Sequence, residues 1–171
     1  MQRPELWDAV PRKRNGQVNE VLVTLGGSDP LGLAPSLVDA LDGEYSVTLV
    51  AGPYFPSVPS RPGLRVLDAP TSFVDAMHAA DLAVSAAGQT LYELVRLGVP
   101  TVALEVAPNQ RPALDALSAA GAVRAATPDT AAAAAAELAA DNDARAPLAW
   151  NAAGLLDGQG ARRVAAAIVG L

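Results

Sequence analysis

The first residues that could do chemistry are two glycines and a serine near the start of the chain. Residues 26–30 read Gly-Gly-Ser-Asp-Pro and follow a short apolar run. Two glycines let a backbone approach an anion closely and Ser28 can donate a hydrogen bond, so Gly27 and Ser28 are candidate phosphate ligands. An ordinary turn into a helix, capped by Ser28 or Asp29, explains the same residues equally well. The loop has neither the G-x-G-x-x-G spacing of a dinucleotide site nor the Gly-Lys-Thr of a P-loop.

A second loop, residues 85–90, reads Ser-Ala-Ala-Gly-Gln-Thr and opens the clearest helix of the chain. A phosphate beside Gly88, Gln89 and Thr90 would meet amide N–H groups at the positive end of the helix dipole. Glu93, one turn further in, could accept hydrogen bonds from two neighbouring hydroxyls, such as those of a ribose. The alternative for Glu93 is a solvated surface residue, which is what a lone helical glutamate usually is.

The third loop, residues 107–110, reads Ala-Pro-Asn-Gln. The amides of Asn109 and Gln110 could bind sugar hydroxyls, and a helix-capping Asn is the alternative. His78 is the only histidine and the chain has no cysteine, which excludes thiolate sites and two-histidine metal motifs. His78 is therefore interpreted as a helix-surface residue, no metal or cofactor is predicted, and the catalytic residues remain unassigned.

The segments that must position these loops alternate in type. Short apolar runs at 20–25, 46–50, 64–67, 81–84 and 101–104 are separated by longer helix-like stretches. This alternation is the signature of βαβ units, so the sequence predicts an α/β, Rossmann-like, three-layer domain with a parallel sheet. In such sheets, ligands bind at the carboxyl ends of the strands, where the three loops would meet.

Three helices can be placed from the sequence. The helix that follows Gly88 buries an apolar stripe and stops at Gly98 and Pro100, which leaves Gln89, Glu93 and Arg96 on its other side. A helix containing the alanine run 131–136 is expected to be capped by Thr127, with Pro128 at its first position. A last helix, opened by residues 157–160 and running through Ile168, is expected to pack on the sheet. The apolar stripe consists of Leu91, Leu94, Val95 and Leu97.

Length and composition favour one compact domain, because the chain has 171 residues, of which 51% are hydrophobic. Residues 1–18 are polar and linker-like, and their basic run at 12–14 is interpreted as a solvated linker. The ordered domain is therefore expected to span residues 19–171.

The charge and the length of the apolar runs exclude some functions. The net charge of −6 and the pI near 4.6 argue against a nucleic-acid surface. No apolar run approaches the roughly 20 residues of a membrane span. The start of the sequence lacks the apolar core of a signal peptide, and a cytoplasmic location is expected.

Four segments together resemble the C-terminal, donor-binding half of GT-B nucleotide-sugar enzymes related to glycosyltransferase family 28. They are VLVTLGGSDP, FVDAMHAADLAVSAAGQTLYELVRLGVPTVAL, APNQ and DGQGARRV, in this order. Within that group, the first and last segments most resemble the UDP-sugar hydrolases of pseudaminic acid biosynthesis and related spore-coat polysaccharide proteins. The peptidoglycan N-acetylglucosaminyltransferases are more distant, since their glycine loop continues Gly-Gly-Ser-x-Gly where Asp29 and Pro30 stand here.

The resemblance implies a role for each candidate residue. Glu93 would bind the ribose hydroxyls, and Asn109 and Gln110 would face the sugar. The diphosphate would be held by Gly27, Ser28, Gly88, Gln89 and Thr90. The segment with Phe73, Val74 and Met77 would hold uracil, largely through its backbone, although packing in the core explains these three side chains at least as well.

The resemblance covers only half of such an enzyme, and the histidine base of the hydrolases lies in the other half. We therefore expect a UDP-sugar-binding domain of an enzyme that hydrolyses or transfers the sugar of a UDP-N-acetyl sugar. Its partner would be an N-terminal GT-B half, in cis or as a separate chain, and the chain alone would be inactive. The alternatives are a stand-alone sugar-nucleotide binding module that pairs with a separate half, and a degenerate Rossmann-like domain kept for interaction.

Overall fold

A six-stranded parallel sheet forms the centre of the protein in the computed structural model, which describes residues 3–56, 58 and 60–170. Its strand order is β3-β2-β1-β4-β5-β6, so the direction in which strands are added reverses between β1 and β4. This confirms the predicted α/β, Rossmann-like architecture. The strands are β1 (Glu20–Thr24), β2 (Ser46–Ala51), β3 (Leu64–Asp68), β4 (Leu82–Ala86), β5 (Thr101–Leu104) and β6 (Arg124–Ala126).

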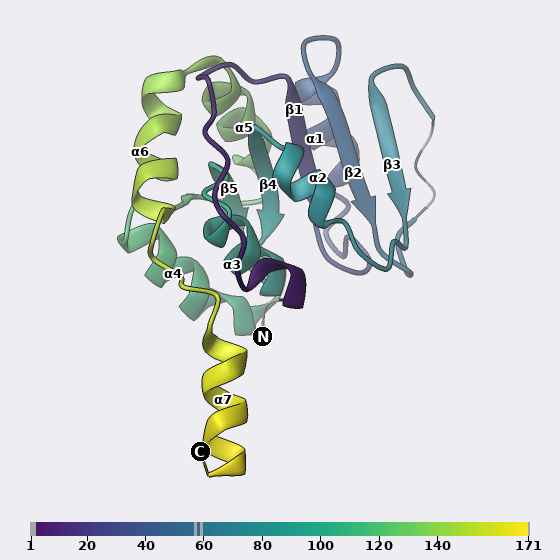
Figure 1. Ribbon diagram of the computed structural model, residues 1–171. Coiled ribbons are helices and arrows are strands. Elements are labelled where there is room, and N and C mark those ends of the chain that lie inside the picture. The colour runs from purple at the N-terminus through teal and green to yellow at the C-terminus, as the bar shows by residue number, and fades with distance from the viewer. Residues whose placement is uncertain (1–2, 57, 59, 171) are drawn as a thin grey trace.

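Helices cover both faces of the sheet (Figure 1). Alternation along β1 sends Val21 and Val23 into the core beneath α1 and α5, and Leu22 into the core beneath α2 and α3. A third cluster joins α3 and α4 on the second face. The helices are α1 (Ala34–Leu41), α2 (Val74–Ala79), α3 (Gln89–Arg96), α4 (Arg111–Ala119), α5 (Ala131–Ala140), α6 (Asn142–Ala152) and α7 (Gly160–Val169), with short 3-10 helices η1 (Pro4–Leu6) and η2 (Pro108–Gln110).

The helix with the alanine run begins three residues later than predicted. The N-cap of α5 is Thr130, not Thr127. The N–H of Thr127 donates to Oγ1 of Thr130 at 3.0 Å, and the carbonyl of Thr127 accepts from Ala131 at 2.9 Å. These bonds fold residues 127–130 into a turn of their own before the helix starts.

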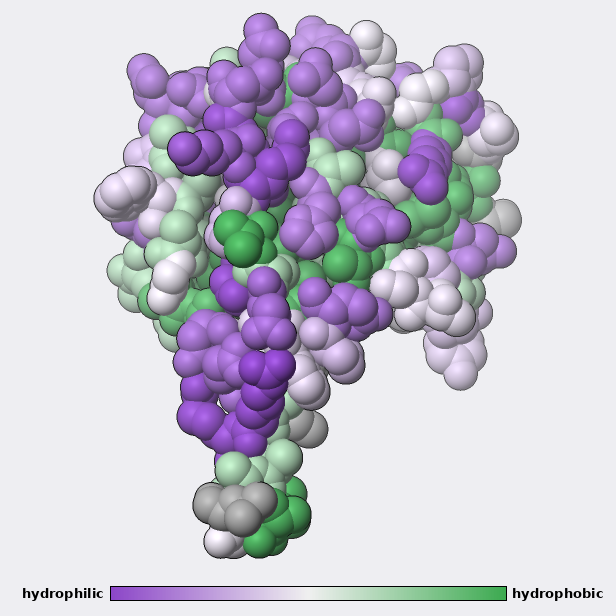
Figure 2. Space-filling model, in the orientation of Figure 1, coloured by the Kyte–Doolittle hydropathy of each residue, from purple (hydrophilic) through white to green (hydrophobic). Residues whose placement is uncertain are grey.

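The last helix does not pack on the sheet, and that expectation was wrong. α7 contains no buried residue and projects away from the domain beyond the carboxyl ends of the strands (Figure 1). Val164, Ile168 and Val169 are among its exposed apolar side chains. In Figure 2, hydrophobic residues gather at the free end of α7, whereas hydrophilic ones surround its start.

The N-terminal segment, residues 3–19, lies against the domain; Arg12 and Lys13 of its basic run are exposed as expected, but both arginines of the run also bind the domain. Arg12 pairs with Asp81, while Arg14 donates to the carbonyls of Ala80 and Gly98 at 3.0 and 2.9 Å. Burial lowers the pKa of Arg14 to about 10. Because these partners lie at the amino-terminal ends of β4 and β5, the arginines tie the segment to that edge of the sheet.

At the opposite edge, the loops after β1 and β2 touch through two glycines. A Cβ placed on Gly52 would lie 2.5 Å from the Cα of Gly27, and the N–H of Tyr54 donates to the carbonyl of Gly27 at 2.9 Å. Gly27 itself has open space where its Cβ would be. Packing thus requires a glycine at position 52, whereas a side chain at position 27 would find open space.

This contrast predicts that two matched substitutions differ in their effect on the free energy of unfolding. Gly52→Ala should lower the free energy of unfolding by about 1–3 kcal/mol, because the added methyl overpacks against a backbone. Gly27→Ala should change it by less than about 0.5 kcal/mol. Urea denaturation of both variants and the parent measures this, and equal stabilities of the two variants would contradict the packing.

Candidate functional site

The two glycine loops start side by side because β1 and β4 are neighbours. Thr24 at the end of β1 is in register with Ser85 in β4, and Gly27 and Gly88 each lie three residues further on. This is the point at which the strand order reverses, where helices leave toward opposite faces and the loops diverge. The fold therefore brings together the two loops that the sequence singled out.

In the first loop, Asp29 has a structural role. Its carboxylate accepts from the N–H groups of Leu33 and Ala34, both at 2.9 Å, and so ties down the start of α1. Asp29 is buried with a φ of +44°, a region that Asp tolerates better than most residues. The capping interpretation holds for Asp29, which leaves Gly27 and Ser28 exposed to a ligand.

In the second loop, Gly88 is the N-cap of α3 and no side chain caps this helix. Gly88 has a φ of −93°, and the nearest atom to a Cβ there would be Nε2 of Gln110 at the ordinary contact distance of 3.7 Å. The fold itself therefore tolerates a side chain at this position. Ser85, in contrast, is buried and donates its hydroxyl to the carbonyl of Ala86 at 2.9 Å.

The third loop contributes Gln110 to the same place. Its side-chain oxygen accepts from the N–H of Val106 at 2.9 Å, which holds the amide nitrogen next to Gly88. Asn109 is exposed within η2, and α4 begins without a side-chain cap, so the helix-capping alternative for Asn109 does not apply. The second and third loops thus meet at Gly88.

Glu93 lies on the other side of α3 as expected, but it is not solvated. Its side chain is 1% exposed and forms an ion pair with the guanidinium of Arg3. The backbone N–H of Arg3 donates to the second carboxylate oxygen at 3.2 Å. Burial raises the pKa of Glu93, and the opposing charge of Arg3 offsets this only in part. A carboxylate that is buried and paired is no ordinary surface residue.

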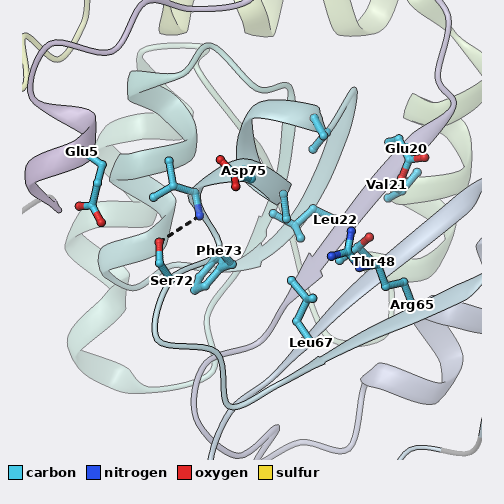
Figure 3. Close-up of a pocket in the computed structure, with 14 residues that line it drawn as sticks. Glu5, Glu20, Val21, Leu22, Thr48, Arg65, Leu67, Ser72, Phe73 and Asp75 are labelled. Atoms are coloured by element: carbon cyan, nitrogen blue, oxygen red, sulfur yellow. Dashed lines mark hydrogen bonds between the residues drawn. The ribbon is translucent and has the colours of Figure 1, made fainter.

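The residues expected near uracil divide between core and groove. Met77 is fully buried in the core beneath α2, which agrees with the alternative that this side chain serves core packing. Phe73 and Val74 are half-buried and line a groove of about 460 Å³ between α2 and the face of β1, β2 and β3 (Figure 3). Ser72 lies at the Phe73 end of this groove, where its Oγ accepts from the N–H of Val74 at 3.5 Å, and Glu5 of η1 reaches toward the same end.

Two features beside the candidate residues could not be found from the sequence: the position of Arg3 and that of Tyr54. Arg3 reaches Glu93 across 90 positions and places its guanidinium 4.5 Å from the centroid of the Phe73 ring. Tyr54, beside Gly27, exposes 82% of its surface at the ligand edge. The Gly52-Pro53 pair, a typical turn signal, is the sequence feature next to it. His78 is half-buried in the last turn of α2.

Neither a metal-binding cluster nor a membrane-spanning helix is present among the described residues. No group of His, Cys, Asp or Glu side chains in this part of the chain is placed to hold a metal ion. Within the same residues, every helix is too short or too polar to cross a membrane.

Comparison with known proteins agrees with this geometry. No protein-family model matches the sequence. The chain is 36% identical over 100 residues to a Helicobacter pylori protein named pseudaminic acid cytidylyltransferase and UDP-2,4-diacetamido-2,4,6-trideoxy-beta-L-altropyranose hydrolase. That match covers 58% of this chain but 19% of the relative.

Solved structures show where the fold occurs. The glycotransferase of kitacinnamycin superposes with a TM-score of 0.69 at 22% identity, covering 99% of this chain and 46% of that one. The Streptomyces sp. SF2575 glycosyltransferase SsfS6, in complex with thymidine diphosphate, superposes with a TM-score of 0.58 at 21% identity, covering 99% and 41%. The chain thus has the Rossmann-like fold found in GT-B glycosyltransferases, and it spans less than half of these two enzymes.

The buried carboxylate makes the stability of the protein depend on pH in a defined direction. Because the pKa of folded Glu93 lies above its ordinary value of 4.5, the folded state binds more protons between these two values. The contribution of Glu93 is therefore fully present below pH 4.5 and is lost as the pH rises through the raised pKa.

We expect Glu93→Gln to remove this loss, because the amide stays neutral. The free energy of unfolding of the parent, minus that of the variant, should fall as the pH rises from about 4 to about 7. Chemical denaturation at several pH values measures the difference. Glu137→Gln, at an exposed glutamate of α5, is the matched control, and the same trend in that variant would contradict the assignment.

Proposed function

We propose that this domain binds a UDP-sugar and serves as the donor-binding half of an enzyme that cleaves the bond between the sugar and UDP. The observation that carries the proposal is the junction of β1 and β4, where the loop with Gly27 and Ser28 starts beside the loop that ends at Gly88, the N-cap of α3. Neither Gly27 nor Gly88 is required to be glycine by packing, which is expected where a ligand comes close to the backbone.

The remaining candidate residues fit the parts of such a ligand. The diphosphate would lie against Gly27, Ser28, Gly88, Gln89 and Thr90, and the sugar would lie near Asn109 and Gln110. Glu93 would take the ribose hydroxyls, and the start of α2, where Phe73 and Val74 line the groove, would take the base, with the buried Met77 packed behind it. A pyrimidine nucleotide is supported by the thymidine diphosphate in one neighbour and by the UDP-sugar hydrolase in the name of the Helicobacter pylori relative.

The reaction would require a second half. Cleavage of the sugar-phosphate bond needs a stabilised leaving group, which the glycine loops and the start of α3 would supply. It also needs a nucleophile and a base beside the anomeric carbon. Asp29 is engaged with the start of α1, and His78 lies in the last turn of α2, so we assign the base to an N-terminal GT-B half. Pseudaminic acid or surface polysaccharide synthesis is the setting we favour, because of that relative.

We further propose that α7 docks on this second half. The helix leaves the domain at the ligand edge, and its exposed side chains include Val164, Ile168 and Val169. The chain covers 46% and 41% of the two glycosyltransferases, which leaves a half of matching size as the occupant. The second half could be joined in cis or supplied as a separate chain.

The first test is the choice of nucleotide. UDP should bind with an affinity in the micromolar to millimolar range, since one half of a cleft covers less of a ligand than the roughly 70–90% typical of closed pockets. ADP should bind more weakly, and NAD should not bind. Calorimetry with the three ligands decides the question, and tighter binding of NAD than of UDP would overturn the proposal.

Gly88→Val tests the diphosphate loop directly. The branched side chain should weaken UDP binding by roughly tenfold or more by blocking the approach to the start of α3, while lowering stability by about 1 kcal/mol. Ala140→Val, at the exposed last residue of α5, is the control and should leave UDP affinity unchanged. Unaltered binding by Gly88→Val would remove this loop from the site.

A third test addresses the second half. We expect no release of UDP from UDP-N-acetyl sugars by this chain alone, and release once an N-terminal GT-B half is added. Ile168→Asp should impair this reconstitution, whereas Trp150→Asp, at an equally exposed residue of α6, should not. Turnover by the chain alone would show that the active site has been misplaced.

A further inference from the structure

Arg3 engages two of the side chains that we assign to the nucleoside, Glu93 and Phe73. Its backbone N–H donates to Oε1 of Glu93 at 3.2 Å, and its guanidinium donates to Oε2. The same guanidinium lies over the ring of Phe73, 4.5 Å from the centroid. Both carboxylate oxygens and one face of the ring are therefore in contact with a single residue of the chain's own N-terminal segment.

The chemistry of these contacts matches that of a nucleoside. A guanidinium is planar, stacks on aromatic rings and carries several N–H donors that suit a carboxylate. A nucleoside presents a planar base and two ribose hydroxyls that can donate to one carboxylate. Arg3 thus makes the stacking contact and the paired hydrogen bonds that a bound nucleoside would make with Phe73 and Glu93.

We propose that Arg3 is an internal competitor of the nucleoside, so that a uridine nucleotide binds fully only after Arg3 has left Glu93 and Phe73. This inference rests on the proposed function, since it concerns the regulation of that same site.

Departure of Arg3 would open the single turn η1, but the segment is fixed immediately downstream of it. Leu6 is fully buried in the core beneath α2 and α3, which fixes the segment three residues downstream. The carbonyl of Trp7 accepts from Nε2 of Gln159 at 3.2 Å, and a Cβ on Gly158 would lie 2.5 Å from that carbonyl oxygen. The side chain of Arg3, in contrast, is 30% exposed. Residues 3–5 can therefore swing out while Leu6 stays in place, at the cost of the η1 bonds from the N–H of Leu6 to the carbonyl of Arg3 and from the N–H of Trp7 to the carbonyl of Pro4.

Arg3→Ala is the test, with Arg12→Ala as the matched control. Arg12 belongs to the same segment and also pairs with an acid, Asp81, but at the opposite edge of the sheet. By calorimetry, Arg3→Ala should bind UDP about threefold to thirtyfold more tightly than the parent, the range expected when a part-exposed ion pair and a cation–π contact no longer compete. Its affinity for inorganic pyrophosphate should not rise, because the competition concerns the nucleoside. Arg12→Ala should match the parent for both ligands.

The sign of the change separates competition from simple electrostatics. Loss of a positive charge near an anion site should weaken UDP binding, whereas loss of a competitor strengthens it. Unchanged or weaker UDP binding by Arg3→Ala, with normal binding by the parent, would overturn this inference and leave the proposed function intact. Failure of the parent and both variants to bind UDP would overturn both. Arg3→Lys, which keeps the charge but loses the planar fork, should fall between the parent and Arg3→Ala.

Discussion

The parallel pairing of β1 with β4 is the constraint on which the candidate site depends. It places the end of β1 beside the end of β4, although their sequences lie some sixty positions apart. Because α1 and α3 then turn to opposite faces, the backbone between them stays open at the edge of the sheet. Gln110 joins the site only because β5 is the next strand along, which brings its loop to Gly88.

The sequence predicted those parts of the fold that depend on local pattern. Apolar runs identified β1 to β5, and the stripe on α3 is buried as expected. β6 was not predicted, because its three residues, Arg-Ala-Ala, form no apolar run. α6 was not predicted, because it is weakly amphipathic and contains Pro147. Periodicity also indicates which side of a helix is apolar but not what that side contacts, which is why α7 was wrongly expected to lie on the sheet.

The burial of Glu93 illustrates the same limit at the level of one residue. The helical pattern correctly placed Glu93 opposite the apolar stripe of α3, but no local signal indicates that Arg3 covers it from 90 positions away. Burying a carboxylate without a partner is costly. A carboxylate that is shielded from water therefore needs a cation or hydrogen-bond donors when no ligand is bound to it. Arg3 supplies both. The pKa of Glu93 is nevertheless raised, which shows that burial outweighs the pairing.

The two ends of the chain are also coupled at the ligand edge. Arg162 pairs with Asp8 at 3.1 Å and lies 5.3 Å from the centroid of the Trp7 ring, while Gln159 binds the carbonyl of Trp7. These contacts bind the start of α7 to the N-terminal segment that carries Arg3. Leu6 lies between these contacts and Arg3, so a swing of residues 3–5 need not disturb α7. The proposed release of Arg3 and the proposed docking of α7 would thus act on neighbouring parts of one segment, which the bond from the N–H of Trp7 to the carbonyl of Pro4 joins at 3.1 Å.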